Sequence, residues 1–526
     1  MTVILCRCDG NIGPELSLSE LTSSLEKRGV KVFIRDMLCR DGIDDVLGLI
    51  DHRGPVVIGG CWGESYRDDF RHTLRRRGID PFALAVVPLL GEKSQERALA
   101  LLFAAVERLR LFPGAGEKNL KPRLARLDGP LSRRDLFRIP RLRHDLVPSI
   151  ETEHCRSSSR RCRLCVKACS RNAVAVDEEG RAAIEKDKCS GCGACVAACP
   201  AKAITYPSFT PAERAKELET LLGDRDGAAP ARRAILFACE DSSLLLHDFI
   251  ATGGLMPADV LPVVVPCLAM VNASSLLSAV AHGAAGVGLL SCRAGNCRKG
   301  EKTGGLAGEI RLANALLSEF GVPGERITLI EEQSLPELRQ GLDDFGERLR
   351  GLEPVRLPVN GEARTGNSGN PLADVVCASA SRRIVLEGHP AIPFGMVTLE
   401  NRSSCTFCGV CEKHCPAGSL ALQAVNGARE LRFHYGDCVG CGECVRNCPE
   451  KVLRMNKMLD TEQLAASRST VLARESAISC SVCGAPFMNE ALFRRIRAGF
   501  TTPEADAVIR MCPDCRSKTA FSELFS

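Results

Sequence analysis

The sequence has few aromatic and few histidine side chains. Phe, Trp and Tyr make up 4% of its 526 residues, with one Trp and three Tyr, and there are nine His. No run of about 18 apolar residues occurs, so we expect no membrane-spanning helix. The N-terminus, Met1–Cys6, lacks the charged segment that opens a secretory signal, and we expect a cytoplasmic protein.

Several sequence signatures of catalysis are also missing. There is no P-loop, no C-x-x-C-H haem attachment, and no G-x-G-x-x-G after a predicted strand, and no two His form a ligand-like pair. Catalysis needs an open metal position, a nucleophile with its base, or an organic cofactor. We therefore predict no self-contained active site in this chain.

Cysteine, in contrast, is abundant. A long chain with 29 Cys and no secretory signal indicates metal ligands rather than disulfides. Metal clusters would also replace some of the packing that aromatic side chains usually supply. The formal net charge is +5, but each four-thiolate cubane would remove roughly two positive charges. The charge therefore does not indicate a nucleic-acid partner.

The most specific motif is Cys189-Ser-Gly-Cys192-Gly-Ala-Cys195-Val-Ala-Ala-Cys199-Pro200, a C-x2-C-x2-C-x3-C-P run typical of bacterial ferredoxins. Its first three thiolates can surround one face of a 4Fe–4S cubane, and the fourth ligates the neighbouring cluster. Gly191 and Gly193 let the backbone approach the inorganic sulfides, and Pro200 stops the helix. Structural zinc or a disulfide framework rarely needs four such closely spaced thiolates and a proline.

This run closes a predicted two-cubane ferredoxin module over residues 151–208. The leading half of the module has a four-residue insertion between its first two cysteines, and Ser170 stands where proline is usual. Cross-ligation predicts two ligand sets. They are Cys155, Cys162, Cys165 and Cys199 for one cubane, and Cys189, Cys192, Cys195 and Cys169 for the other.

A second two-cubane module is predicted over residues 396–458. Both of its halves have the complete spacing and end in Pro416 and Pro449. The predicted ligand sets are Cys405, Cys408, Cys411 with Cys448, and Cys438, Cys441, Cys444 with Cys415.

Residues 1–111 alternate short apolar runs with amphipathic segments, which predicts βαβ units and a parallel sheet. The predicted strands are Val3–Leu5, Val30–Ile34, Val56–Ile58 and Leu84–Val87. Four cysteines follow the first three strands, at the edge where open α/β sheets bind ligands. They are Cys6, Cys8, Cys39 and Cys61. We expect a cluster site, the alternative being buried free thiols.

Three pieces of this region resemble the N-terminal domain of the A-type subunit of heterodisulfide reductase. They are Cys6-Arg-Cys8-Asp-Gly-Asn11-Ile12-Gly13, Met37-Leu-Cys39, and Val57-Ile-Gly-Gly-Cys61 followed by Phe70-Arg71. The resemblance implies that the four cysteines hold a fifth 4Fe–4S cluster. The flavin domain that follows in that family is missing here.

Residues 231–350 form a second predicted α/β domain. Its predicted elements are the strands Ala234–Phe237, Leu261–Val265, Val287–Leu290 and Ile327–Ile330, and the helix Leu306–Phe320. Cys239, Cys267 and Cys292 each fall just past a predicted strand, and Cys297 lies one loop further on. The thiols again gather at one sheet edge.

This domain resembles the delta subunit of methyl-viologen-reducing hydrogenase. The matching pieces are Val265-Pro-Cys267 and Gly283-Ala-Ala-Gly286-Val287-Gly-Leu-Leu-Ser-Cys292-Arg-Ala-Gly-Asn-Cys297. The resemblance implies a 2Fe–2S centre that passes electrons between a hydrogenase or formate dehydrogenase and heterodisulfide reductase. The family has a further Cys after the first, where this chain has Ser242 or Ser243. Zinc or a thiol–disulfide pair are the alternatives.

Two linkers and a tail complete the chain. Residues 112–150 read as a basic linker and residues 353–371 as a second linker, after which Cys377 stands alone as a small apolar residue. The tail, residues 475–526, carries four cysteines in two knuckle-like pairs on either side of a predicted helix, 489–498. They are Cys480, Cys483, Cys512 and Cys515. Two such pairs make a tetrahedral four-sulfur site for zinc. The pairs also resemble the knuckles of rubredoxin, which would imply a single iron ion. The aromatic core of rubredoxin is missing, which favours zinc.

The chain is thus predicted to be multidomain α/β and α+β. It has two small parallel-sheet α/β domains, two bacterial ferredoxin-like modules and a C-terminal zinc-ribbon or rubredoxin-like knuckle domain. We expect an electron-transfer subunit between a low-potential donor (hydrogenase, formate dehydrogenase or ferredoxin) and a heterodisulfide-reductase-like or flavin-containing partner, in an anaerobe and in a hetero-oligomer. The alternatives are a redox sensor or assembly protein, and an oxidoreductase that binds its own flavin or nicotinamide.

Overall fold

The computed structural model divides the chain into two compact units. It describes residues 1–12, 15–38, 54–61, 70–71, 73–75, 77–124, 142–223, 232–292, 297, 304–331, 334–353, 355, 357, 371–466, 468–499 and 503–524. Unit 1 comprises Met1–Glu153, Leu164–Ala175 and Ala182–Val359, and unit 2 comprises His154–Arg163, Val176–Arg181 and Asn360–Ser526. Across these ranges, no helix has the length and apolar character needed to cross a membrane.

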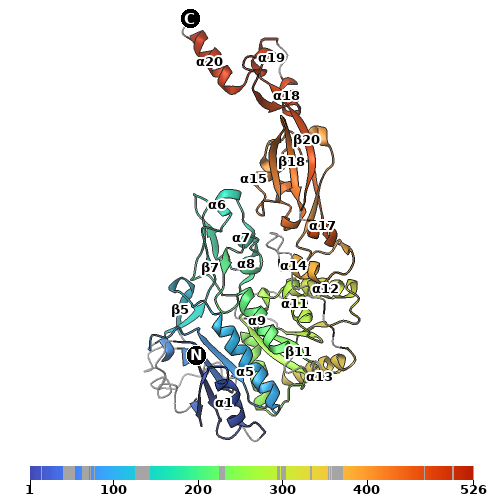
Figure 1. Ribbon diagram of the computed structural model, residues 1–526. Coiled ribbons are helices and arrows are strands. Elements are labelled where there is room, and N and C mark those ends of the chain that lie inside the picture. Colours follow the sequence, from blue (N-terminus) through green and yellow to red (C-terminus); the bar gives the residue numbers. More distant parts are fainter. Residues whose placement is uncertain are drawn as a thin grey trace. The chain divides into compact units, whose positions relative to one another are not determined.

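The first domain of unit 1 is a parallel four-stranded sheet with helices (Figure 1). Its elements are β1 (Thr2–Cys6), α1 (Leu18–Glu26), β2 (Lys31–Arg35), β3 (Val56–Gly60), β4 (Leu84–Pro88) and α5 (Gln95–Arg110). The strand order is β2-β1-β3-β4, and all neighbours are parallel. β1 and β3 are buried along their whole length, as expected for central strands of a sheet covered on both faces.

The second α/β domain of unit 1 repeats this topology. Its strands are β11 (Ala234–Cys239), β12 (Val260–Val265), β13 (Val287–Leu290) and β14 (Ile327–Ile330), in the parallel order β12-β11-β13-β14. Its helices are α10 (Glu240–Ala251), η3 (Leu268–Met270), α11 (Ala273–Ala281), α12 (Gly304–Glu319) and α13 (Leu335–Arg350). In both sheets the first strand lies between the second and the third. The carboxyl ends of the first and third strands therefore form the switch point where such sheets bind ligands.

The first ferredoxin module continues unit 1. Its elements there are α7 (Leu164–Ala168), β8 (Val174–Val176, its last residue in unit 2), β9 (Ala182–Ile184), α8 (Ala194–Ala197), β10 (Ile204–Thr205) and α9 (Pro211–Leu222). The expected linker 112–150 needs correction at its described ends. η1 (Glu117–Asn119) precedes β5 (Leu120–Leu124), which pairs antiparallel with β6 (Leu142–Leu146), and β7 (Ser149–Ile150) pairs with β10.

Unit 2 contains α6 (Ser157–Arg160), the second ferredoxin module and the tail. A three-stranded sheet has the order β15 (Val385–Glu387), β19 (Leu453–Asp460), β16 (Gly395–Leu399), and a four-stranded sheet has the order β17 (Leu420–Val425), β18 (Ala428–His434), β20 (Ser469–Ser479), β21 (Pro486–Asn489). The helices are α14 (Pro371–Ser379), η4 (Arg402–Ser404), α15 (Val410–Lys413), η5 (Tyr435–Asp437), α16 (Glu443–Arg446), α17 (Thr461–Ala466), α18 (Glu490–Arg497), α19 (Pro503–Ile509) and α20 (Pro513–Leu524).

β20 connects the second ferredoxin module to the tail. It pairs with β18, which lies between the two cysteine runs, and with β21, which follows the first cysteine pair of the tail. The tail and the second module therefore share one antiparallel sheet (Figure 1).

Candidate metal centres

The second ferredoxin module encloses one of its predicted ligand sets around a small cavity of about 20 Å³. The cysteines that line it are Cys405, Cys408, Cys411 and Cys448, the set expected from cross-ligation. Cys405 is buried, whereas Cys408 is exposed. Apolar side chains, including Leu399, Phe407 and Leu431, complete the wall. Burial raises the pKa of the Cys411 thiol to about 12, so binding of iron must displace a proton there.

The other set of this module is also brought together. Cys415, Cys438 and Cys444 are buried and Cys441 is partly buried. Burial, and the neighbouring Cys438 and Cys415, raise the pKa of Cys444 to about 12. Burial raises the pKa of Cys438 to about 11. Such thiols are weak nucleophiles without a metal, and they fit a cage for a cluster.

A left-handed turn recurs after the last cysteine of each half-module. The third residue after that cysteine has positive φ in all four cases: Asn172, Lys202, Gly418 and Lys451. In three of them the next backbone N–H donates to the cysteine sulfur, from Ala173 to Cys169 at 3.2 Å, Ala203 to Cys199 at 3.3 Å and Ser419 to Cys415 at 3.2 Å. Hydrogen bonds to the sulfurs stabilise the more negative, reduced cluster.

In the first module, the set of Cys169, Cys189, Cys192 and Cys195 lies wholly in unit 1. Cys189 packs with Cys169, and Cys195 packs with Cys165, Cys169 and Cys199. Burial raises the pKa of Cys195 to about 12. Lys121 donates through Nζ to the carbonyl oxygens of Asp187 at 3.0 Å and Cys189 at 2.8 Å, and so places a positive charge beside this set.

Cys155 and Cys162 belong to unit 2, so their grouping with Cys165 and Cys199 stays a prediction. The inserted residues between them form the helical turn α6. Arg161, directly before Cys162, has φ of 51°, as Gly191 before Cys192 has φ of 68°. The insertion therefore keeps the local backbone conformation that precedes the second cysteine of a half-module.

The N-terminal site lies at the switch point of its sheet. Cys6 ends β1, and Cys61 directly follows β3. A left-handed turn at Cys8 and Asp9 brings the Cys8 thiol to within 3.3 Å of Cys6 Sγ. The Cys8 hydrogen bond lowers the pKa of Cys6 to about 6, and contacts with Cys6 and Cys61 raise that of Cys8. Three of the four predicted ligands are thus together, and Cys39 lies outside the described residues.

The second α/β domain has a cavity of about 240 Å³ at its own switch point. All four predicted cysteines line it: Cys239, Cys267, Cys292 and Cys297. Cys239 is the last residue of β11 rather than the first beyond it, and its sulfur accepts from the Ser242 backbone N–H at 3.3 Å. The Cys292 hydrogen bond lowers the pKa of Cys239 to about 6 and raises that of Cys292.

Neither serine takes the place of a fifth ligand in this cavity. The Ser242 hydroxyl donates to the Leu290 carbonyl oxygen at 2.9 Å, and the Ser243 hydroxyl to that of Glu240 at 2.8 Å. Neither lines the cavity, which has four thiols and the carboxylates of Asp241 and Glu309 on its wall. Four thiols at one cavity fit a small iron–sulfur cluster.

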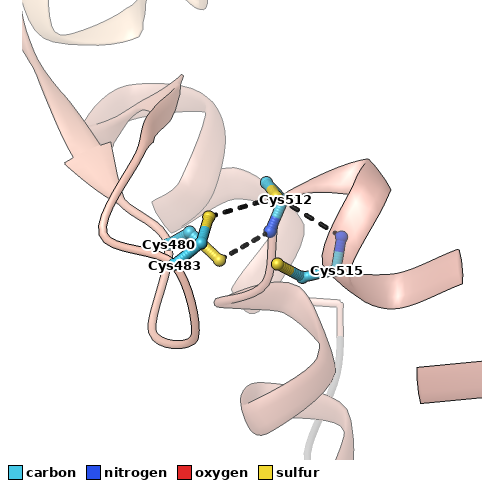
Figure 2. A group of neighbouring side chains, drawn as sticks. All are labelled: Cys480, Cys483, Cys512 and Cys515. Atoms are coloured by element: carbon cyan, nitrogen blue, oxygen red, sulfur yellow. Dashed lines mark hydrogen bonds between the residues drawn. The ribbon is translucent and has the colours of Figure 1, made fainter. Parts of the chain in front are cut away.

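The tail gathers its four cysteines into one site, with all four sulfurs within 4.8 Å of one another (Figure 2). Cys483 Sγ and Cys512 Sγ are 3.7 Å apart. A tetrahedral ion with metal–sulfur bonds of about 2.3 Å requires sulfurs about 3.8 Å apart. The backbone N–H groups of Cys483 and Cys512 lower the pKa of Cys480 to about 6. The four sulfurs therefore fit a single tetrahedral ion.

The two cysteine pairs of the tail differ in structure. Cys480 and Cys483 form a turn between β20 and β21, closed by Gly484 with φ of 72°. Cys512 instead precedes Pro513, the first residue of α20, and Cys515 lies in the first turn of that helix (Figure 2). The expectation of two knuckles is therefore correct only for the first pair. Because a helix N-terminus stabilises negative charge, the start of α20 is a suitable place for thiolate ligands of a metal ion.

Sequence reasoning missed two side chains beside these sites. Lys121 lies in the expected linker, where nothing in the sequence indicates a cluster. Met270, in η3 after Cys267, packs against Gly193 between Cys192 and Cys195, since a Cβ on Gly193 would lie 2.5 Å from Met270 Cγ. Only the fold brings these residues next to cysteines distant in the sequence.

Two families match segments of the chain. Residues 234–353 match the delta subunit of methyl-viologen-reducing hydrogenase. Residues 159–217 and 404–452 match the 4Fe-4S dicluster domain. These segments contain the second α/β domain and most of the two predicted ferredoxin modules.

Two curated relatives are similar over short segments. The polyferredoxin-like subunit of an aliphatic sulfonate oxidoreductase from Pyrococcus furiosus is 49% identical over 45 residues, which are 8% of this chain and 26% of the relative. A ferredoxin from Pyrobaculum islandicum is 42% identical over 57 residues, which are 11% of this chain and 53% of the relative. The chain thus spans about a quarter of the length of the first relative and about half of the length of the second. Segments of this chain therefore match a hydrogenase delta-subunit model once and a 4Fe-4S dicluster model twice.

Proposed function

We propose that this chain is an electron-transfer subunit that relays single electrons between a low-potential donor and a second redox protein. The donor is a hydrogenase, a formate dehydrogenase or a ferredoxin, and the acceptor is a flavin-containing or heterodisulfide-reductase-like subunit. The observation that carries the proposal is the combination, in one chain, of two dicluster domains and a delta-subunit domain with four cysteines around one cavity.

The cysteine sets suggest how the cofactors are distributed. We assign four 4Fe–4S clusters to the two ferredoxin modules and one 2Fe–2S cluster to Cys239, Cys267, Cys292 and Cys297. We assign a fifth 4Fe–4S cluster to the N-terminal site, with Cys39 as the fourth ligand. The tail would hold zinc, because its sulfur spacing suits a tetrahedral ion and the aromatic core of rubredoxin is missing. When bound, the clusters supply one-electron redox chemistry, and the protein supplies thiolates, backbone N–H groups and burial.

The chain would work in a hetero-oligomer in the cytoplasm of an anaerobe. Its cysteines ligate and tune clusters, and no side chain is required to move a proton. The chemistry that begins or ends the electron path then lies in partner subunits. The domains assigned here supply only the path between them.

The competing hypothesis is a redox sensor or assembly protein. A sensor thiol needs a low pKa and access to solvent. Cys377, the cysteine outside all predicted ligand sets, is partly buried on α14, and burial raises its pKa to about 11. This thiol is therefore poorly suited to sensing, which favours the relay.

Metal analysis after anaerobic purification tests the proposal. We expect about 16 iron atoms from the ferredoxin modules, about six from the two α/β domains, matching sulfide, one zinc and no flavin. The reduced protein should pass electrons to its co-purifying partner over repeated turnovers. A colourless protein with zinc in the ferredoxin modules would contradict the proposal, and so would full iron content without turnover.

A further inference from the structure

The helix α8 separates two cysteine sites of unit 1. Cys195 lies within α8 and Cys199 just beyond it, and both pack with Cys165 and Cys169 inside the ferredoxin module. Ala194 and Ala197 of the same helix line the cavity of the second α/β domain. Residues three or four apart share a helix face, so α8 presents one face to each site.

The two domains are in tight contact at this helix. Gly193, the N-cap of α8, has φ of 73°, and a Cβ there would lie 2.5 Å from Cγ and 2.7 Å from Sδ of Met270. Met270 is 4% exposed and packs with Val196 of α8 and with Tyr206. Its backbone N–H donates to the Cys267 carbonyl oxygen at 3.1 Å. One short 3-10 helix therefore joins a cysteine of the cavity to the loop of the ferredoxin cluster.

We infer that the centre held by Cys239, Cys267, Cys292 and Cys297 exchanges electrons directly with the cubane of Cys169, Cys189, Cys192 and Cys195, across α8 and Met270. This inference rests on the proposed function. An α-helix with its side chains is about 10–12 Å across. The face of α8 toward the cavity carries only the small side chains of Ala194 and Ala197, so the helix adds little to the separation of the two centres. A single electron leaves one centre, which is oxidised, and reaches the other, which is reduced, and no bond or proton moves.

This pair of centres gives the chain an internal order of electron transfer. The delta-like domain adjoins the second cubane set of the first module through α8, so the first ferredoxin module, rather than a partner, is its immediate electron neighbour. The alanines of α8 and the side chain of Met270 then have a role beyond packing, because they keep the separation between the two centres short.

Electron paramagnetic resonance of the full-length, anaerobically purified protein tests this pair. The signal of the delta-like centre is assigned by its loss in Cys267→Ala. In the unaltered protein, we expect this signal to broaden and to relax faster once the neighbouring cubane is reduced, because two nearby unpaired spins couple. This measurement needs no variant in α8.

Two matched variants locate the coupling. Cys195 and Cys444 occupy equivalent positions, because each is the third cysteine of the second cysteine run in its module. The variants Cys195→Ala and Cys444→Ala should each contain about four iron atoms fewer than the unaltered protein. We expect slow relaxation of the delta-like signal in Cys195→Ala and unchanged fast relaxation in Cys444→Ala. Two results would contradict direct exchange between these two centres without contradicting the proposed electron-transfer function. One is full iron content with no spin coupling in the unaltered protein, and the other is spin coupling that is lost only in Cys444→Ala. A delta-like domain without iron overturns the proposed function itself.

Discussion

The sulfur atoms of this chain are tuned by a few neighbouring groups. N–H donors at left-handed turns and the ammonium group of Lys121 face sites that would gain negative charge on reduction. Each such group stabilises the reduced cluster relative to the oxidised one and so raises its reduction potential. The effect of a single charge can be measured one residue at a time.

Replacing Lys121 by Met should lower the reduction potential of the cubane at Cys189. Its Nζ lies 2.8 Å from the Cys189 carbonyl oxygen, and loss of one charge at this range should shift the potential by on the order of 50 mV. A redox titration followed by electron paramagnetic resonance measures the shift. Lys118→Met, at an exposed position of η1, is the control and should leave every potential unchanged. Equal potentials in the two variants would rule out the electrostatic role of Lys121.

At the scale of elements, the contact between α5 and α9 depends on a buried ionic network. Arg108 of α5 and Arg214 of α9 both pair with Glu217, and the side chains are only 12–16% exposed. Burial lowers the pKa of Arg214, and the carboxylates of Glu217 and Glu213 oppose this shift. The network joins the N-terminal α/β domain to the helix that follows the first ferredoxin module.

Glu217→Gln should destabilise this pair of helices by roughly 3 kcal/mol, because it removes the carboxylate that pairs with both buried guanidinium groups. Hydrogen exchange of peptides from α5 and α9 gives the local opening free energy, which suits a multidomain chain better than a global melt. Glu219→Gln, on the same helix with its side chain 60% exposed, should change the value by less than about 0.5 kcal/mol. Similar losses in both variants would contradict a role for burial.

The proposed zinc site makes the stability of the tail elements testable. Cys512→Ser should remove the single zinc ion and leave the iron content unchanged, because three sulfurs no longer complete a tetrahedral site. Protection against hydrogen exchange in α18, α19 and α20 should then fall, since metal binding stabilises small domains of this kind. Cys377→Ser is the control and should keep both metals. Loss of iron in place of zinc from Cys512→Ser would instead indicate a rubredoxin-like centre.

The pattern of apolar residues along each helix or strand explains which parts of the fold could be predicted. Strands with unbroken apolar runs were found within two residues, and the limits of Val287–Leu290 and Ile327–Ile330 agree with the structure. β20 was missed because most of its residues are exposed or half-buried, so it lacks an apolar run. The helix α8 has four residues, too few for a period to show. Cysteine spacing predicts which thiols line the cavity of the second module, but not that Gly193 meets Met270, since no local pattern encodes a contact between domains.

For the molecule as a whole, cluster loading should reverse the sign of the net charge. The polypeptide alone has a formal charge of +5, and the four oxidised cubanes proposed for the ferredoxin modules contribute about −2 each with their thiolates, which by themselves bring the charge to about −3. Anaerobic isoelectric focusing should therefore show an acidic holoprotein and a basic apoprotein. A basic band that retains its full iron content would contradict this assignment of four-thiolate cubanes.

The two α/β domains of the molecule share one plan. Each places its first strand between the second and the third, and each has a cysteine at the end of the first strand and another just after the third. The sequence predicts that cysteines follow the strands in both domains, whereas the strand order within each sheet is known only from the structure. The physical reason is that a switch point is open to a ligand in either sheet.

Exposure of Cys408 has a consequence for handling the protein in air. Its three companions at the cavity are buried or half-buried, whereas Cys408 is an exposed residue. Dioxygen and peroxide attack accessible cluster ligands first. In an aerated cell extract, oxidative loss of clusters should begin at the cubane that Cys408 ligates. Brief aeration would then give a protein that has lost this one cluster, while the more enclosed clusters remain and still absorb visible light.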